Sequence, residues 1–299
     1  MSPIVFDLTS LDPDDRAVVR ALVEAATAAD GVSPLNERAM MRLDDVGAYL
    51  AAAGPATSSG TDVAHSPVIG YAQVDPDDLT AQVVVHPDRR RQGVGRGLVE
   101  RIAADHAGVR FWAFGDLPAA QGLATATGRA VVRELLIMQR PLTDLPTPDP
   151  RPGVAVRPYT PADAAAVVAV NAAAFASHPE QGAMDLADFS RRLVNPSDIV
   201  VAVDSATDEV LGFHWTKQHG DGLGEVYVIG VSPDAAGRGL GRTLLWAGLG
   251  HLAREGSDRV ILYVEGDNAT AVRLYESSGF RTIHRDVLYG PPTNEGDGA

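Results

Sequence analysis

Apolar and polar positions alternate along the chain in a pattern that predicts strands and helices, most clearly in the C-terminal half. β-Branched residues dominate positions 225–231, and an apolar stripe with helical spacing begins at Leu240. A Ser-Pro pair and glycines at 237, 239 and 241 lie around this junction, which therefore predicts a strand, a turn and a helix N-terminus. The first N–H groups of a helix are unpaired and its dipole favours negative charge there. We therefore expect an anion site that a diphosphate can enter where glycines leave room.

The same pattern occurs in the N-terminal half. Residues 79–85 predict a strand, and a loop with glycines at 93, 95 and 97 leads into an apolar helical stripe. An offset of 146 places Gly93 on Gly239, and an offset of 151 places residues 116–128 on residues 267–279. The chain is therefore interpreted as a duplication of one domain-sized unit.

Both halves predict an α/β (α+β) order of elements. In the first we expect strands at 4–8, 68–74, 79–85 and 131–139, helices at 12–29 and 35–50, and a loop at 54–67. In the second we expect strands at 154–157, 199–203, 210–217, 225–231, 259–265 and 282–289, and helices at 161–175, 185–194, from 240 to 255 and from 268 onward. Five prolines make residues 141–153 a semi-rigid linker. The predicted domains are 1–140 and 154–290, with a disordered polar tail at 291–299.

Composition narrows the possible functions. A chain of 299 residues with 45% hydrophobic residues can bury two cores. The net charge of −14 argues against nucleic acid or an anionic membrane as partner. The absence of cysteine excludes disulfides, thiolate metal sites and a Cys nucleophile, and the histidines lack ligand spacing, so no metal is proposed. Since no signal peptide or membrane-length apolar run is present, we expect a cytoplasmic protein. A monomer is the working expectation, although the sequence does not fix the oligomeric state.

Two motifs at the right spacing carry a family resemblance. The first is the strand followed by an R/Q-x-x-G-x-G/A loop and a helix, and the second consists of Asn268, Ala271, Leu274, Tyr275, Gly279 and Phe280. Together they resemble the GCN5-related N-acetyltransferase (GNAT) family across nearly the whole chain. The resemblance implies two tandem GNAT domains, each a mixed, mostly antiparallel twisted sheet flanked by helices, with acetyl-CoA as co-substrate.

The resemblance also implies which residues contact acetyl-CoA. In the second unit these are Ile229, Gly230, Val231, Ala236, Gly237, Arg238, Gly239, Leu240, Gly241, Arg242, Asn268, Ala269, Thr270, Ala271, Val272 and Arg273. In the first unit they are Val83, Val84, Val85, Arg91, Gln92, Gly93, Val94, Gly95 and Arg96. The R/Q position is Arg90 in the first unit and Ala236 in the second, so we expect a modest loss of affinity there, offset by Arg238 or Arg242.

Amine acetylation needs a base for the amine and a donor for the departing thiolate. Glu225 begins the strand before the glycine loop and is the candidate base; a solvated strand-end Glu is the alternative. Tyr275 is the candidate donor to sulfur, against the alternative of a packed helical aromatic. The offsets place Leu79 on Glu225 and Ala124 on Tyr275. We therefore expect catalysis only in the second unit, and a degenerate acetyl-CoA-binding scaffold in the first.

The acceptor is implied by similarity alone. Two such domains, with Gly-Phe-His-Trp-Thr-Lys at 212–217, resemble family members that acetylate the cysteinyl α-amine of a cysteinyl-glucosaminyl-inositol, a small thiol precursor. The residues nominated to bind it are Glu37, Glu180, Lys217, Glu225 and Tyr263, and Glu37 would bring the acceptor near the domain interface. Glu37 and Glu180 are equally consistent with exposed surface carboxylates. Another amine, of a protein N-terminus or an aminoglycoside, and a non-catalytic acyl-CoA sensor stay open as alternatives.

Overall fold

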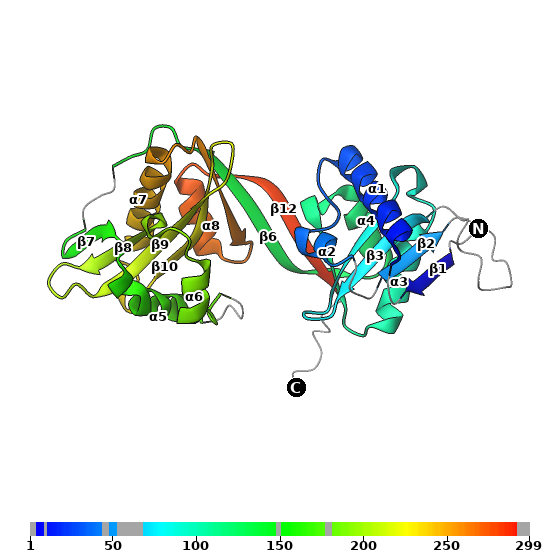
Figure 1. Cartoon of the computed structure of the whole chain (residues 1–299), viewed down its shortest axis with the longest axis horizontal. Coiled ribbons are helices and arrows are strands. Elements are labelled where there is room, and N and C mark those ends of the chain that lie inside the picture. The colour runs from blue at the N-terminus through cyan, green and yellow to red at the C-terminus, as the bar shows by residue number, and fades with distance from the viewer. Residues whose placement is uncertain are drawn as a thin grey trace. The chain divides into compact units, whose positions relative to one another are not determined.

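The computed structural model describes residues 4–8, 11–43, 48–52, 68–147, 151–176 and 181–291 (Figure 1). The chain forms two compact units. The N-terminal unit lies within Met1–Leu135, Glu265–Asp267 and His284–Ala299, and the C-terminal unit within Leu136–Val264 and Asn268–Ile283. The units differ from the predicted ranges because each takes the end of a strand from the other half of the chain.

The N-terminal unit is built on the strand order β1-β2-β3-β4-β5-β12. Pairing is antiparallel except between β4 and β5, which are parallel. Its strands are β1 (Ile4–Leu8), β2 (Ala48–Ala52), β3 (Val68–Asp75), β4 (Thr80–Val85), β5 (Arg110–Ala113) and the end of β12 (Arg281–Gly290). Its helices are α1 (Pro13–Asp30), α2 (Glu37–Met41), α3 (Val94–Asp105) and α4 (Pro118–Ala126), with short 3₁₀ turns η2 (Pro87–Arg89) and η3 (Phe114–Asp116).

The C-terminal unit repeats this plan in the order β6-β11-β10-β9-β8-β7. Only β10 and β11 are parallel among the pairs whose register is defined. Its strands are the end of β6 (Ala130–Pro141), β7 (Val154–Pro158), β8 (Ile199–Asp204), β9 (Val210–Gln218), β10 (Leu223–Val231) and β11 (Arg259–Glu265). Its helices are α5 (Ala164–Ala174), α6 (Leu186–Arg192), α7 (Leu240–Arg254) and α8 (Ala269–Ser277), with 3₁₀ turns η4 (Pro161–Asp163), η5 (Pro196–Asp198) and η6 (Pro233–Ala235). The expected mixed, mostly antiparallel sheet with helices is confirmed.

The last strand of the chain completes the N-terminal unit. Val287 of β12 pairs with Ala113 of β5, and the Tyr289 hydroxyl donates to Asp116 at 2.6 Å. The Gly115 N–H donates to the Asp286 carboxylate at 2.8 Å. The end of β6 makes the reciprocal contribution, because Met138 is fully buried in the core of the C-terminal unit. Local sequence patterns do not encode such pairings, which is why the predicted domain ranges missed the exchange.

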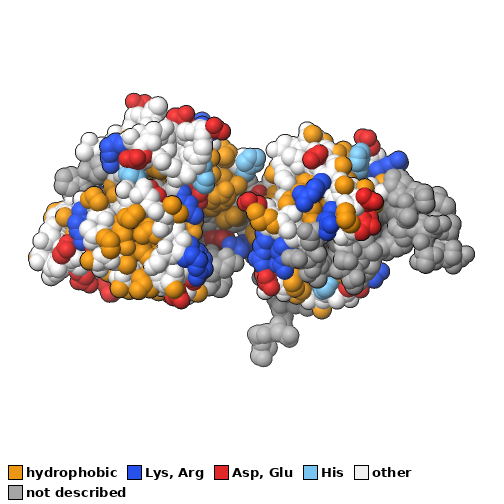
Figure 2. All heavy atoms as spheres, viewed as in Figure 1, with side chains coloured by type: hydrophobic (Ala, Val, Ile, Leu, Met, Phe, Trp, Pro, Cys, Tyr) orange, Lys and Arg blue, Asp and Glu red, His pale blue; other side chains and the backbone are white. Residues whose placement is uncertain are grey.

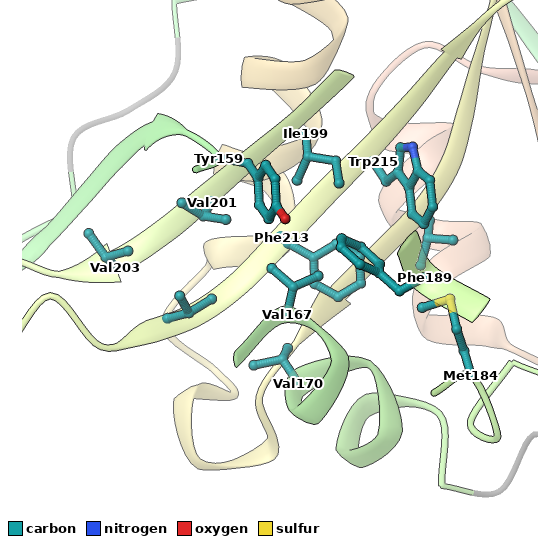
Figure 3. Packing of buried hydrophobic residues seen from close by; sticks show 12 residues of the cluster. Tyr159, Val167, Val170, Met184, Phe189, Ile199, Val201, Val203, Phe213 and Trp215 are labelled. Atoms are coloured by element: carbon teal, nitrogen blue, oxygen red, sulfur yellow. The ribbon is translucent and has the colours of Figure 1, made fainter. Parts of the chain in front are cut away.

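Helices cover both faces of the C-terminal sheet. One core lies between the sheet and α5 and α6, where Phe189, Phe213 and Trp215 interlock (Figure 3). The other core lies on the side of α7 and α8 and includes Val226 and Tyr275. The two faces are therefore separate layers, and any chemistry that involves both must pass through the sheet.

One element prediction was wrong. The helix expected over residues 35–50 is limited to α2, whose first turn is capped by the Asn36 side chain accepting from the Ala39 N–H at 2.8 Å. Residues 48–52 instead form β2, which pairs with both β1 and β3. Pairing on two sides outweighs the high helix propensity of the alanines in this stretch. The loop expected at 54–67 and most of the tail lie outside the described residues.

Candidate active site

The predicted anion site is formed by the loop before α7. Gly237 and Gly239 have φ of 77° and 75°, a backbone conformation that suits glycine. The first intrahelical bond runs from the Thr243 N–H to the Gly239 carbonyl, and no side chain caps the helix at Gly239. The N–H groups of the first turn are therefore available to an anion. The N-terminal unit has the same backbone, since Arg91, at the position of Gly237, takes a φ of 62°.

Strands β10 and β11 separate beside this loop. Their pairing ends at Val226 and Leu262, although β10 continues to Val231 and β11 to Glu265. Beyond this point the backbone groups of β10 that face β11 have no partner on that strand. This is the stretch where the sequence predicts hydrogen bonds to the pantetheine arm and the acyl carbonyl.

A β-bulge at Tyr227 lies at the same place. Val226 pairs with Thr216, but Val228 pairs with Trp215, so Tyr227 is one extra residue. Val226 packs in the core below α7, whereas Val228 packs in the opposite core below α5. In a regular strand these two side chains would share a face. The bulge thus reverses the alternation of β10 next to the point where the strands separate.

Glu225 lies just before the bulge. A Cβ placed on the preceding Gly224 would meet Leu252 of α7, and Val226 also faces α7, so the Glu225 side chain points to the opposite face. It pairs across the strands with Lys217. The His219 Nε2 lies 2.7 Å from the Glu225 Oε2, with 44% of the His219 side chain and 12% of the Glu225 side chain exposed.

His219 was missed by the sequence reasoning, which considered histidines only as metal ligands. A signal was present: a short turn between two predicted strands brings residues six apart near each other across a hairpin. The His219 N–H donates to the Leu223 carbonyl at 2.8 Å, which closes this turn. The contact makes His219 a partner that can orient Glu225 and exchange protons with solvent.

Lys217 and Tyr263 lie on the same face as Glu225. The Lys217 Nζ lies 3.2 Å from the centre of the Tyr227 ring, a cation–π contact on the face that Glu225 also occupies. Tyr263 lies between buried Leu262 and Val264, both in the core below α7, so its half-exposed side chain points to the other face. The structure thus gathers three of the predicted acceptor residues on one face of the C-terminal unit.

The other two predicted acceptor residues are not part of this group. Glu37 is exposed on α2 in the N-terminal unit. Glu180 lies outside the described residues. Both therefore stay predictions.

Tyr275 lies on the opposite face, in the core with Val226. It is 9% exposed, and its ring meets that of Phe280 edge to face with centroids 5.6 Å apart. Burial raises the pKa of Tyr275 to about 12, so the phenol keeps its proton across the neutral range. No hydrogen bond joins it to Glu225, and the separating strands lie between the two.

The first turn of α7 meets α8 at Leu274 and Ser277. A Cβ on Gly241 would lie 3.7 Å from Leu274, and Arg242 donates to the Ser277 hydroxyl at 2.9 Å. Asn268 caps α8 as expected, its side chain accepting from the Ala271 N–H at 3.1 Å. The predicted contact residues from 268 to 273 occupy the other end of α8, and their binding role stays a prediction.

Register shifts the N-terminal counterpart of Glu225 by one residue. Val74 of β3 pairs with Ala81 of β4 without a bulge, as Thr216 pairs with Val226 in the C-terminal unit. Thr80, rather than Leu79, therefore occupies the position of Glu225. The expectation that this position lacks a carboxylate is unchanged, because Thr80 is a buried hydroxyl residue.

The N-terminal unit contains a cavity of about 500 Å³ at its glycine loop. All its predicted contact residues except Gln92 line this cavity, as do Ala124, at the position of Tyr275, and Tyr289. Arg90, at the R/Q position, also lines it, but both its terminal nitrogens contact Asp30 of α1 at 2.7 Å. Its charge is therefore compensated within the protein.

Other classes of site find no support in the described part of the chain. No three His, Asp or Glu side chains there lie together as a metal site requires, and no helix among those residues is long and apolar enough to cross a membrane. Figure 2 shows acidic and basic side chains intermixed over the visible face of each unit.

Comparison with known proteins agrees with this architecture. The Acetyltransferase (GNAT) family model matches residues 167–280, and the Acetyltransferase (GNAT) domain model matches residues 61–126. A GCN5-related N-acetyltransferase structure from Sphaerobacter thermophilus superposes with a TM-score of 0.72 at 24% identity, covering 96% of this chain and 95% of that one. A tandem GNAT protein from the clavulanic acid biosynthesis pathway superposes with a TM-score of 0.61 at 19% identity. The match covers 97% of this chain and 98% of that one. Fold and motifs therefore define an acetyltransferase with two GNAT domains.

Sequence relatives narrow the assignment. Mycothiol acetyltransferase of Thermomonospora curvata is 43% identical over 97% of this chain and 97% of its own length. The enzyme of the same name from Mycolicibacterium smegmatis is 41% identical over 94% of this chain and 97% of its own. The chain belongs to the mycothiol acetyltransferase family.

Proposed function

We propose that this chain transfers the acetyl group of acetyl-CoA to the α-amine of a cysteinyl-glucosaminyl-inositol and so forms mycothiol. The observation that carries the proposal is the position of Glu225. It lies on the face opposite the α7 loop, beside the bulge where β10 and β11 separate, and it is held by His219. The names of the relatives support a role in forming mycothiol, and the family resemblance of the sequence implies the acceptor.

The C-terminal unit fits acetyl-CoA as a substrate. Gly237 and Gly239 give the diphosphate close access to the uncapped start of α7. The edge of β10 from Tyr227 to Val231 offers backbone groups to the pantetheine arm. Acetyl-CoA supplies the activated acyl group, and the thioester reaches the acceptor face between β10 and β11.

Glu225 acts as the base. The acceptor amine is an ammonium near neutral pH and attacks only after it loses a proton. Glu225 accepts this proton, directly or through water, and His219 passes it on to solvent from its exposed edge. Lys217, the cross-strand partner of Glu225, places a positive charge on the same face of the sheet.

Two hydrogen-bond donors act on the thioester. An unpaired N–H of β10 donates to the carbonyl oxygen as it gains negative charge. The Tyr275 hydroxyl, kept protonated by burial, donates to the departing sulfur. Since its pKa exceeds that of a free thiol, about 8.5, the phenol stabilises the thiolate mainly as a hydrogen-bond donor.

We further propose that the N-terminal unit binds acetyl-CoA without catalysis. Its glycine loop and cavity support binding. Thr80 and Ala124 supply neither a carboxylate nor a phenol at the positions of Glu225 and Tyr275.

The test is to supply acetyl-CoA with the cysteinyl-glucosaminyl-inositol, a peptide panel or an aminoglycoside, and to measure CoA release and product mass. The expected result is rapid turnover with the first acceptor alone. A preference for peptide amines or the aminoglycoside would overturn the proposed acceptor. Binding of acetyl-CoA without CoA release for any amine would indicate a sensor instead.

A further inference from the structure

Arg151, in the Pro-rich linker before β7, lies over the glycine loop of the same unit. A Cβ placed on Gly239 would lie 3.0 Å from both the Cζ and an Nη of Arg151. The Arg151 Nε also lies 3.4 Å from the Thr243 hydroxyl, one turn into α7. The glycine at 239 lets this guanidinium lie directly against the start of the helix.

The position of this charge is unfavourable without an anion. The N-terminus of a helix carries partial positive charge, which repels a guanidinium. Among the described residues, no carboxylate lies within ion-pair distance of Arg151. Arg157, a few residues along the chain, contrasts with it, because both Asp163 and Asp208 contact its guanidinium.

The other cations near this loop are differently engaged. Arg242 donates to the Ser277 hydroxyl. Backbone N–H groups of Ala206 and Thr207 lower the pKa of the Asp204 carboxyl, and the charge of Arg238 adds to this effect. The R/Q position of the loop motif, where family members carry a cationic or polar side chain, is occupied by the uncharged Ala236. In the N-terminal unit Arg90 fills that position but is neutralised by Asp30.

We propose that Arg151 binds the diphosphate of acetyl-CoA in the C-terminal unit and supplies the cation that Ala236 lacks. The diphosphate then lies between a guanidinium and the N–H groups of α7, and it cancels the repulsion between them. The linker thereby contributes directly to the substrate site. This inference rests on the proposed use of acetyl-CoA by this unit.

The kinetic test compares acetyl-CoA with acetyl-pantetheine, which lacks the diphosphate. Arg151→Ala should raise the KM for acetyl-CoA roughly ten- to a hundredfold, the loss expected for charged hydrogen bonds, with little change in kcat. The same variant should use acetyl-pantetheine as well as the wild type does. Arg151→Lys should lie between the two, since it keeps the charge but not the planar fork.

Arg254→Ala is the matched control. It removes the same charge from the other end of α7, about 20 Å away by helix rise, and should leave both substrates unaffected. An equal loss of Arg151→Ala activity with acetyl-CoA and acetyl-pantetheine would overturn the proposal, because it would indicate damage to the fold. No loss with either would also overturn it.

A second readout does not depend on turnover. Phenylglyoxal modification of Arg151, followed by peptide mass spectrometry, should be slowed by CoA but not by pantetheine, and Arg254 should be protected by neither. Protection by pantetheine, or no protection by CoA, would contradict the assignment. If the wild type does not acetylate the cysteinyl acceptor but CoA protects Arg151, only the proposed function fails. If acetylation occurs without protection, only this inference fails.

Discussion

The N-terminal and C-terminal units share a glycine loop at the start of a helix and differ in what surrounds it. Even the contacts of the first turn agree: Arg96 reaches the Ala126 carbonyl at 3.0 Å, and Arg242 reaches Ser277, the residue that an offset of 151 places on Ala126. Around this shared glycine loop, the C-terminal unit has the β-bulge, Glu225 and Tyr275. The N-terminal unit has a continuous β3–β4 ladder, Thr80 and Ala124 instead.

This difference shows that binding the nucleotide and activating the amine are separable properties of the fold. The diphosphate site at the glycine loop depends on backbone conformation, which can persist when a side chain changes. Arg91, for example, has nearly the same positive φ as Gly237 at the equivalent position. The proposed chemistry depends on individual side chains and on one inserted residue in β10. A duplicated domain can therefore keep nucleotide binding and lose activation of the amine.

The largest expected effect comes from Glu225→Gln. It removes the base but keeps the shape, so kcat should fall roughly 10²-fold or more. Calorimetry should show unchanged acetyl-CoA binding, because the diphosphate site is untouched. Thr80→Glu in the N-terminal unit is the matched gain test and should create no activity. A Glu225→Gln enzyme with normal turnover would falsify the base assignment.

Tyr275→Phe should have the next largest effect. The ring still fills the core beside Phe280, so the thermal midpoint should change little while kcat falls by about 10²-fold, the lower end for loss of a proton donor. Because burial keeps the phenol protonated up to a pKa of about 12, wild-type kcat should show no loss from this group between pH 7 and pH 10. A fall in stability without a fall in kcat would indicate a packing role only.

Acid should destabilise the C-terminal unit selectively. His214 is fully buried, its Nδ1–H donates to the Leu244 carbonyl at 2.8 Å, and burial lowers its pKa to about 4. The unfolded chain takes up a proton below about pH 6.5 that the folded unit does not, so the free energy of unfolding should fall as pH falls from 6.5 to 4. The slope is about 1.4 kcal/mol per pH unit, or tenfold in the unfolding equilibrium.

His214→Gln should flatten this slope, whatever its effect at pH 7. Ala72 occupies the equivalent position in the N-terminal unit, which therefore lacks this contribution. Urea unfolding between pH 7 and pH 5 in a Trp112→Phe background would report Trp215 and Trp246, both in the C-terminal unit. Equal slopes in the variant and its parent would assign the acid sensitivity to groups other than His214.

The smallest expected effect comes from Ala124→Tyr. The phenol would enter the cavity of the N-terminal unit and weaken acetyl-CoA binding there about tenfold, as steric overlap in a packed site does. Turnover should stay within about twofold of wild type. Calorimetry should thus lose one of two binding events. A loss of turnover as large as the loss of binding would mean that acetyl-CoA bound in the N-terminal unit takes part in catalysis.

Local patterns in the sequence determined much of the architecture. Alternation marked most strands, the glycine spacing marked both loops, and Asn268 marked a helix start that the structure confirms. These features depend on residues within one or two turns of each other, so a linear pattern contains them. The duplication and the family motifs then indicated an acetyltransferase before any contact was known.

Tertiary structure alone decided which residues meet across long separations. Strands β6 and β12 exchange ends, Arg151 lies against Gly239, and His219 holds Glu225. The bulge at Tyr227 shows the reason most plainly: it adds one residue to β10, so a fixed offset aligns Glu225 with Leu79 while hydrogen-bond register aligns it with Thr80. Sequence order records spacing along the chain, whereas register is set by pairing with a neighbouring strand.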